Sequence, residues 1–341
     1  MAHTVGIKDV AREAGVSIGT VSNVLNRPDT VTAATRARVL AAIDRLGYVR
    51  SESARQLRAG SSRIIAMLVP DIANPFFVTV ARGAEREARR AGLGVMLCNS
   101  AQSAVEEAEY LSLFGAQRVR GVLVSPADGT GRALRDFRRH RIPFVLVDRV
   151  LPGLDDGCSV SVDNVVGGLL AVRHLLALGH RSVTYVSGPM HLQQCRDRHA
   201  GALAAVREAG LGAGALEHLR TERLDVASGL DAGARLLGLP RPPAAVFCAN
   251  DLLALGVLQA MYSAGVAVPR EVAIVGYDDI EFAAAAATPL TSVRQPAELL
   301  GRTAARLLAE ETAPTASAHR HRSVVLQPEL VVRASTWESV L

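Results

Sequence analysis

The sequence lacks the short motifs that mark several common classes of enzyme. It contains no G-x-x-x-x-G-K-[ST] loop, no G-x-G-x-x-G after a predicted strand and no G-x-S-x-G, the motifs of nucleotide, dinucleotide and acyl-transfer sites. No apolar run approaches the roughly 18 residues that cross a membrane. The N-terminus carries no charged-then-apolar leader that would direct export. We therefore expect a cytoplasmic protein without enzymatic activity.

Cysteine and histidine are too scattered in the sequence to predict a disulfide framework or a metal site. No two cysteines have C-x-x-C spacing, and we expect four buried, reduced thiols. The pair His319 and His321 is interpreted as part of a solvated loop, so we expect no metal and no cofactor. The four cysteines are Cys98, Cys158, Cys195 and Cys248.

The charge is unevenly distributed along a chain of otherwise ordinary composition. The 341 residues are 49% hydrophobic and 21% charged, which is typical of a soluble protein with more than one domain. Residues 1–63 hold ten Lys or Arg against five Asp or Glu, and the remaining chain holds 28 of each. The whole excess of +5 therefore lies at the N-terminus. A basic module on a neutral body is typical of a polyanion-binding head, although a solvated basic face gives the same count.

The stretch Ile7–Asn26, IKDVAREAGVSIGTVSNVLN, predicts two short helices joined by a tight turn. Apolar residues recur at i, i+3, i+4 and i+7 over Lys8–Ala14, which indicates one helix face. Gly15 tolerates the left-handed backbone of a sharp turn, and Ser17 is a good N-cap for a second helix over Ile18–Leu25. Such an arrangement is a helix-turn-helix, although any amphipathic helix pair can share the pattern.

The longer string from Ile7 to Tyr48, which adds a predicted third helix over Ala33–Leu46, resembles the DNA-binding headpiece of the lac/purine repressor family. The resemblance implies that the second helix enters the major groove of duplex DNA. Base edges would be read by Ile18, Gly19 and Asn23, and phosphates would be contacted by Thr20, Ser22 and Asn26.

Residues 51–62 have weak helical patterning and a single large apolar side chain, Leu57. So short a polar segment is marginal as a free helix. The family resemblance implies a hinge helix that folds on DNA and inserts Leu57 into the minor groove, where an apolar wedge unstacks a base step. The alternative is a plain linker.

From residue 63 onward, apolar runs alternate with amphipathic helices. Strands that alternate with helices predict parallel sheets covered on both faces, and about 280 residues are too many for one sheet. We expect an α/β core of two Rossmann-like lobes with a ligand cleft at the carboxyl ends of the strands. The predicted strands are Ile64–Val69, Val95–Cys98, Val122–Ser125, Phe144–Asp148, Val183–Gly188, Ala245–Cys248 and Ala273–Tyr277. The predicted helices are Val78–Ala91, Glu106–Gln117, Gly167–Leu178, Arg198–Ala209, Ala227–Leu237 and Leu252–Ala264.

The core also resembles the two-lobed periplasmic sugar-binding fold that the repressor family shares. The resulting fold class is an all-α helix-turn-helix headpiece (1–50) and hinge helix (51–62), followed by a periplasmic-binding-protein-like core (63–341). The chain would cross between lobes three times, near Ser161–Asp163, Thr291–Ser292 and Leu326–Glu329. Lobe one would be 63–161 plus 293–325, and lobe two 162–291 plus 328–341.

Polar and aromatic residues follow the predicted strands at the edge where a ligand would lie. Carboxylates, guanidinium groups and amides form directional bonds to hydroxyls, and phenyl rings cover the apolar faces of a sugar. Each also has a simpler interpretation as a helix cap, a core ring or a local ion pair. The resemblance to sugar-binding relatives implies that the ligand, of ribose or another aldose type, contacts Asn74, Phe76, Phe77, Asp148, Arg149, Arg198, Asn250, Asp278 and Gln295. A tenth contact is expected at Leu224, which stands where many relatives have a stacking aromatic residue, and this difference leaves the identity of the ligand open.

These features together predict a ligand-responsive transcriptional repressor that binds a near-palindromic operator as a homodimer. No leucine heptads follow Trp337, which favours a dimer over a tetramer. Three alternatives stay open at this point. The effector could be a purine, a nucleoside or a sugar phosphate, the core could be a sugar-active enzyme fused to the DNA-binding head, or the chain could be an exported sugar-binding protein.

Overall fold

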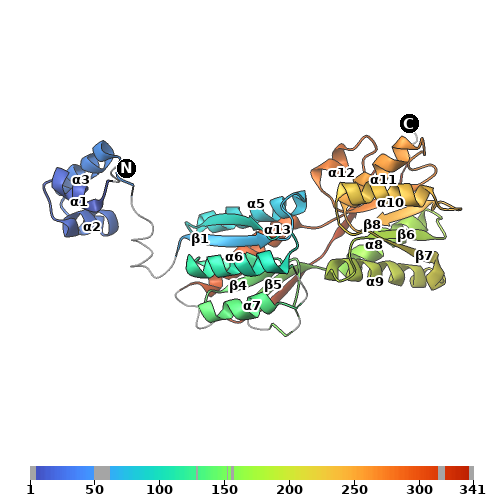
Figure 1. Ribbon diagram of the computed structural model, residues 1–341, viewed down its shortest axis with the longest axis horizontal. Helices are drawn as coiled ribbons and strands as arrows, with labels where there is room; N and C mark the ends of the chain where they lie inside the picture. The colour runs from blue at the N-terminus through green and yellow to red at the C-terminus, as the bar shows by residue number, and fades with distance from the viewer. Residues whose placement is uncertain are drawn as a thin grey trace. The chain divides into compact units, whose positions relative to one another are not determined.

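The computed structural model describes residues 5–49, 62–127, 130–151, 153–154, 157–313 and 319–337. The chain divides into two compact units, Met1–Ser62 and Arg63–Leu341. Figure 1 shows the first as a small group of helices and the second as an α/β body. None of the helices in these described ranges combines the length and the apolar character needed to span a bilayer.

The N-terminal unit contains the three helices that the sequence predicts. Gly15 adopts a φ of 60° in the turn after the first helix. Ser17 caps the second helix, because its hydroxyl accepts a 3.1 Å hydrogen bond from the amide of Thr20. Gly47 ends the third helix at a φ of 58°. Val10, Val21 and Val39, one from each helix, form the fully buried centre of the unit. The elements are α1 Ile7–Glu13, α2 Ile18–Asn26, the 3-10 turn η1 Pro28–Thr30 and α3 Ala33–Leu46.

The second unit contains two six-stranded sheets, one in each lobe. Every pairing is parallel except that between β10 and β12. The lobe-one sheet, in the order β11-β5-β4-β3-β1-β2, consists of β1 Ile64–Val69, β2 Gly94–Asn99, β3 Gly121–Val124, β4 Phe144–Val147, β5 Cys158–Val162 and β11 Ser323–Leu326. The lobe-two sheet, in the order β12-β10-β9-β8-β6-β7, consists of β6 Val183–Ser187, β7 Leu216–Arg220, β8 Ala245–Cys248, β9 Ala273–Asp278, β10 Thr291–Arg294 and β12 Glu329–Val331.

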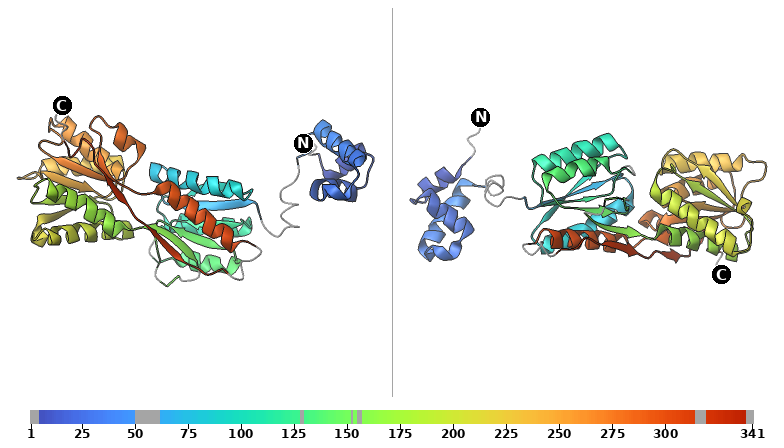
Figure 2. Two further views of the ribbon diagram at one scale, coloured as in Figure 1. Left: turned by 180° about the vertical axis from the view of Figure 1, so that it is seen from behind. Right: turned by 90° about the horizontal axis from the view of Figure 1, so that it is seen from below.

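Helices cover both faces of each sheet, as the views in Figure 2 show, so the predicted doubly covered α/β lobes are confirmed. Lobe one carries α5 Pro75–Arg90, α6 Ala104–Ala116, α7 Arg132–Phe137 with η2 Arg138–His140, and α13 Ala297–Glu311. Lobe two carries α8 Asn164–Ala177, α9 Gln193–Glu208, η3 Ala213–Ala215, α10 Val226–Leu237, α11 Asp251–Ser263 and α12 Glu281–Ala285.

Three helix pairs pack closely through reciprocal glycines. In each pair, one glycine on either helix faces the backbone of the other, and a Cβ at any of these positions would lie between 1.9 and 2.3 Å from a facing carbonyl oxygen. Only glycine permits so close an approach. The pairs are α5 with α13 (Gly83, Gly301), α8 with α9 (Gly168, Gly201) and α10 with α11 (Gly229, Gly256).

The chain passes between the lobes after β5, β10 and β11, and the second passage differs from the predicted one. β10 pairs with β9 as far as Arg294, so the passage follows Arg294 instead of lying at Thr291–Ser292, and residues 293–294 belong to lobe two. Thr291 and Ser292 are polar residues of the kind that often ends a strand, yet both are fully buried. Their hydroxyls form 2.7 Å hydrogen bonds: that of Thr291 is shared with the hydroxyl of Thr336, and that of Ser292 donates to the carboxylate of Asp251.

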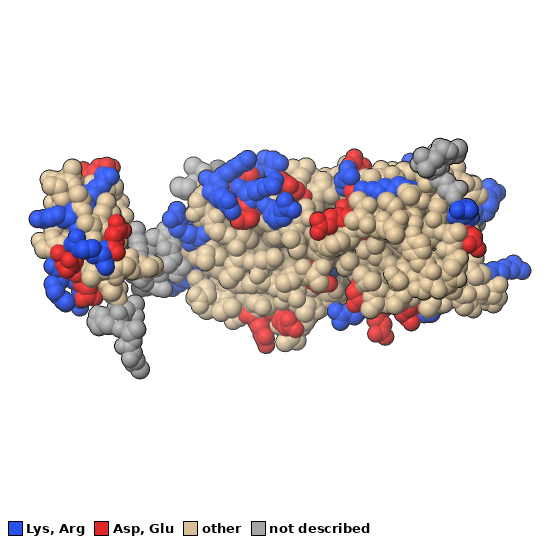
Figure 3. Space-filling model, turned by 90° about the horizontal axis from the view of Figure 1, so that it is seen from above, with Lys and Arg blue, Asp and Glu red and all other residues tan. Residues whose placement is uncertain are grey.

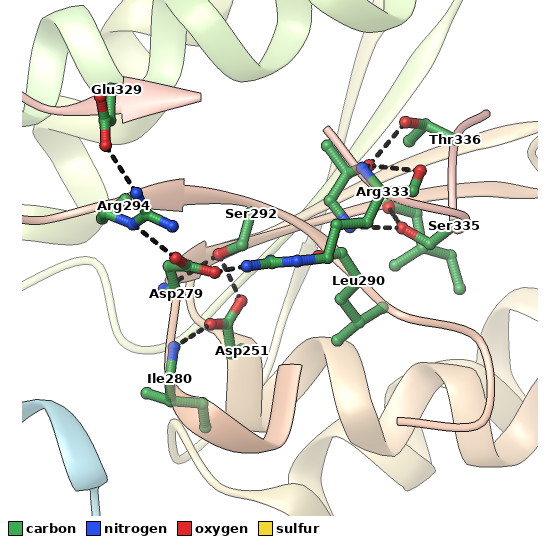
Figure 4. A network of polar contacts seen from close by, with 12 residues as sticks. Asp251, Asp279, Ile280, Leu290, Ser292, Arg294, Glu329, Arg333, Ser335 and Thr336 are labelled. Carbon is green, nitrogen blue, oxygen red and sulfur yellow. Dashed lines mark hydrogen bonds and ion pairs between the residues drawn. The ribbon is translucent and has the colours of Figure 1, made fainter. Parts of the chain in front are cut away.

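A network of polar contacts holds these passage segments to lobe two (Figure 4). Asp279 accepts bonds from the guanidinium groups of Arg294, at 2.7 Å, and Arg333, at 2.6 Å. Arg294 in turn donates a 2.8 Å bond to Glu329 at the start of β12. Since Arg294 ends β10, the network fixes the directions in which two passage segments leave the lobe.

Candidate functional site

A pocket lies between the carboxyl ends of the strands of the two lobes. The space between its atoms is about 540 Å³, part of it open to solvent. All ten residues predicted to contact an effector line it. The lining is Pro70, Asp71, Asn74, Phe76, Phe77, Gln102, Asp148, Arg149, Leu192, Gln194, Arg198, Leu224, Asn250, Asp278 and Gln295.

Asn74 both caps helix α5 and lines the pocket. Its Oδ1 accepts a 3.0 Å bond from the amide of Phe76 at the start of α5. Its Nδ2 donates a 3.3 Å bond to Asp278 at the end of β9, in the other lobe. Asp278 also accepts a 2.7 Å bond from the amide of Gln295. These contacts connect the lobes at the edge of the pocket.

A second polar link between the lobes joins Asp148, after β4, to Gln194 in the first turn of α9. The Gln194 amide donates a 2.6 Å bond to Oδ2 of Asp148. Burial raises the pKa of Asp148 to about 6, against the opposing effects of Arg198 and the Gln194 bond.

Gln194 was missed in the sequence analysis because it follows a loop after β6 with no local motif. Only the approach of the lobes shows its role.

Arg198 is the central cation of the pocket and is 95% buried. Its Nε donates a 2.8 Å bond to Asn164, and its Nη1 donates to the carbonyl of Ala249. Its guanidinium lies 3.6 Å from the centre of the Tyr277 ring and 4.0 Å from the carboxylate of Asp278. Burial raises the pKa of Asp278, and Arg198 opposes that rise.

The apolar lining of the pocket is aromatic on the lobe-one side and aliphatic on the lobe-two side. Phe76 and Phe77 from lobe one stand edge to face with ring centres 5.0 Å apart. Leu224 and Leu192, from lobe two, complete the apolar lining. The carbonyl of Leu224 accepts a 3.0 Å bond from Asn250, which also caps α11.

Three buried side-chain oxygens of the pocket accept no hydrogen bond from the described part of the chain: Asp148 Oδ1, Gln194 Oε1 and Gln295 Oε1. Buried acceptors without donors are costly in a folded protein. Hydroxyl groups of a bound molecule can supply the missing donors. The pocket is therefore chemically suited to a polyhydroxylated ligand.

The outer face of α2 carries the residues predicted to meet DNA. Ile18, Gly19 and Asn23 are exposed, and the Ile18 side chain is 44% exposed. The Asn26 amide donates a 2.7 Å bond to the carbonyl of Ser22, and the hydroxyls of Thr20 and Ser17 lie 2.9 Å apart. Leu57 lies outside the described residues.

Arginines gather on lobe one over α5, on the face shown in Figure 3. Most of these charges are paired there, because Arg86 contacts Glu298, Arg89 contacts Glu85 and Arg90 contacts Glu87. This surface is therefore partly neutralised. On the N-terminal unit, basic and acidic side chains are interspersed on the same view.

The prediction that His319 and His321 lie in a solvated loop is confirmed in part: both lie outside helices and strands and His321 is exposed, but His319 is half-buried. The structure brings both rings beside Cys158 at the start of β5, with Cys158 Sγ 3.2 Å from Nε2 of His319. Sequence spacing gave no sign of this, because 161 residues separate Cys158 from His319. Cys158, Cys195 and Cys248 are buried free thiols, and Cys98 is half-buried.

Comparison with known proteins identifies the family. Residues 6–51 match the model described as "Bacterial regulatory proteins, lacI family", and residues 172–336 match a periplasmic binding protein-like domain. The chain is 35% identical over 333 residues to the HTH-type transcriptional repressor PurR of Photobacterium profundum, covering 96% of this chain and 98% of that one. It is 35% identical to the ribose operon repressor of Escherichia coli (strain K12), with 96% and 99% covered.

The fold comparison agrees with the sequence comparison. The structure of the lac repressor dimer bound to operator and the anti-inducer ONPF superposes with a TM-score of 0.85 at 27% identity, covering 98% of this chain and 99% of that one. The chain belongs to the lacI family of bacterial regulatory proteins, as a DNA-binding transcriptional repressor with a periplasmic-binding-protein-like effector core.

Proposed function

We propose that this repressor binds a near-palindromic operator as a homodimer and that a neutral sugar, ribose or another aldose, controls its DNA affinity from the pocket between the lobes. The observation that carries the proposal is the set of polar residues from both lobes around one pocket. Such a protein acts in the cytoplasm, at the DNA. The relatives named as the ribose operon repressor and the lac repressor dimer support the choice of ligand and of assembly.

The balance of charge favours a neutral ligand over a sugar phosphate. The pocket contains the carboxyl groups of Asp148 and Asp278 and the guanidinium groups of Arg149 and Arg198. Arg198 already bonds Asn164 and Ala249, and Arg149 donates to the carbonyls of Pro126 and Ala127. A phosphate needs cations and donors that are not already engaged by the protein.

The apolar lining favours a sugar over a purine. A flat nucleobase is held best between two aromatic faces, and this pocket has rings on the lobe-one side only, at Phe76 and Phe77. Leu224 gives an aliphatic contact on the lobe-two side. A furanose or pyranose needs less stacking area and more hydrogen-bond acceptors, which Asp148 and Gln295 offer. The purine effector remains a competing outcome of the experiment below.

On the DNA side, the exposure of α2 supports a division of roles. Asn23 can bond adenine bidentately and Ile18 can meet a thymine methyl, and both side chains are exposed. Gly19 has no side chain and so contributes little to the recognition of base sequence. Thr20, Ser22 and Asn26 are suited to phosphates. Leu57 would act at the operator centre by deforming the duplex.

Coupling between the sites would act through the angle between the lobes. Asn74 with Asp278, and Gln194 with Asp148, are direct bonds between the lobes. A sugar that bonds both carboxyl groups changes the free-energy difference between lobe angles. That angle would determine whether the hinges of two subunits can fold together on DNA.

The test begins with a duplex that the full chain selects from a random pool. Fluorescence anisotropy then measures its affinity with ribose, arabinose, xylose, hypoxanthine or ribose 5-phosphate present. We expect a pentose to change the affinity at least about fivefold, and Asp148→Asn to weaken that response. A matched control is Asp136→Asn, at an exposed position of α7. A response to hypoxanthine or ribose 5-phosphate alone would overturn the neutral-sugar assignment, and no response to any compound would overturn effector control.

The DNA contacts are tested with the same duplex. We expect Asn23→Ala to cost about 1–3 kcal/mol of binding and to relax preference at one position of each half-site. The control is Asp44→Ala on α3. An unchanged sequence preference for Asn23→Ala would refute the assignment of Asn23 to base reading. Sedimentation of the DNA complex reports whether two chains bind one duplex.

A further inference from the structure

A cluster of potential metal ligands lies in lobe one, outside the pocket and α2. It consists of the Cys158 thiol, the Glu311 carboxyl group and the imidazoles of His319 and His321. One ligand atom from each residue lies within 4.8 Å of the ligand atoms of the other three. Cys158 is buried, Glu311 and His319 are half-buried, and His321 is exposed.

Three separate elements bring these side chains together. Cys158 is the first residue of β5, and Glu311 is the last residue of α13. The histidines precede β11, which pairs in parallel with β5 so that Ser323 lies beside Ser159. The amide of Ser159 donates to the carbonyl of Arg322, which places the segment before β11 alongside Cys158. Because the strands are parallel, the cluster is at the edge of the sheet opposite the pocket.

From this convergence we propose that Cys158, Glu311, His319 and His321 form a binding site for a divalent transition-metal ion, with Zn²⁺ as the ion that fits best. Zn²⁺ takes four ligands of these types in a tetrahedron. At the usual bond lengths, a thiolate sulfur and an imidazole nitrogen on one Zn²⁺ are about 3.6 Å apart. Cys158 Sγ lies 3.2 Å from Nε2 of His319 and 4.0 Å from Nδ1 of His321, so small movements satisfy both.

A thiol–imidazole hydrogen bond is the simpler explanation of the Cys158–His319 contact. It requires one histidine, whereas two histidines and a carboxyl group converge on this sulfur. The nearby cation of Arg322 does not compete for the ion's position, because its Nη2 is bonded to Glu310 at 2.8 and 3.1 Å. A mixed sulfur, nitrogen and oxygen set is unsuited to Mg²⁺ or Ca²⁺, which prefer oxygen ligands.

A bound ion would join the end of α13 and the segment before β11 to the start of β5. Both strands continue into passages between the lobes, after Val162 and Leu326. The ion would therefore hold these two strands together at the end away from the pocket. Binding to the folded state alone raises the melting temperature by mass action.

The test uses the full chain without a histidine tag, treated with a chelator and then dialysed. Zn²⁺ is titrated in competition with a chromophoric chelator, and Co²⁺ is added separately to observe the thiolate-to-metal charge-transfer band. We expect one ion per chain, a higher melting temperature with Zn²⁺ and a thiolate band with Co²⁺. Loss of a direct ligand, by Cys158→Ser or His321→Ala, is expected to weaken Zn²⁺ binding by at least about a hundredfold.

The controls separate metal binding from folding. His321 is exposed, so His321→Ala should retain the circular dichroism spectrum even if the buried Cys158→Ser does not. Cys98→Ser and His180→Ala remove the same residue types elsewhere and should leave one ion bound. Absence of stoichiometric Zn²⁺ binding, absence of the thiolate band, or full binding by His321→Ala would each overturn the proposal.

Discussion

Asp148 connects the stability of the core to pH, and Asp148→Asn tests the electrostatics of the pocket. The carboxyl group is 5% exposed and lies among Arg149, Arg198 and Asp278. Burial raises its pKa from the usual 3.8 to about 6. Asparagine has the same shape, keeps an acceptor for the bond from Gln194 and has no charge.

The sign of the effect follows from proton binding. Between pH 4 and 6 the folded chain holds a proton on Asp148 that the unfolded chain has released. Its contribution to stability is therefore present below pH 4 and is lost as the pH rises to about 6, where it levels off. A shift of about two pKa units corresponds to about 3 kcal/mol. The unfolding free energy of Asp148→Asn minus that of the wild type should rise by that amount between pH 4 and 7.

Urea unfolding of the full chain, without sugar, provides the measurement. Trp337 is the sole tryptophan of the sequence; it lies in the unit of residues 63–341 and is 57% exposed, so its fluorescence follows that unit and not the headpiece. Asp136→Asn, at an exposed position of α7, is the control and should show a pH-independent difference. If the difference for Asp148→Asn is equally flat from pH 4 to 7, the carboxyl group is not forced to remain protonated by burial and the reasoning is refuted.

Three further substitutions test the packing and the passage network. Gly168→Ala would place a Cβ 2.0 Å from the carbonyl oxygen of Arg198. We expect overpacking to lower the unfolding free energy by about 1–3 kcal/mol and calorimetry to show weaker sugar binding. The control, Gly212→Ala, lies in open space and should change neither quantity. Asp279→Asn removes the carboxylate that Arg294 and Arg333 share. Since Arg294 is 46% exposed, we expect the unfolding free energy in urea to fall by only about 1–2 kcal/mol. An unchanged unfolding midpoint would contradict this role. Gly47→Ala, at a φ of 58°, should lower headpiece stability by about 1 kcal/mol in circular dichroism melting, without moving the Trp337 transition.

Three of the strands that the sequence analysis missed contain polar residues, and the structure gives two physical reasons for them. β5, CSVSV, and β10, TSVR, contain polar residues of the kind that often end a strand, yet their hydroxyls are bonded inside the fold, as in the 2.8 Å bond between Ser159 and Ser323. β7 carries charged residues because it is the edge of its sheet. Local hydrophobicity cannot distinguish a satisfied buried serine from a solvated one, because the partner lies far away in the sequence.

The sequence by itself predicted the three headpiece helices and seven of the twelve strands that the structure describes in the core, and the family resemblance indicated ten of the fifteen residues that line the pocket. Caps, glycine turns and apolar periodicity are local properties, and parallel strands present their carboxyl ends at one edge. The tertiary structure alone decided which polar groups meet across the lobes, such as Asp148 with Gln194, and which distant ligands surround Cys158. These contacts depend on the packing of elements more than 40 residues apart, and no local pattern specifies that packing.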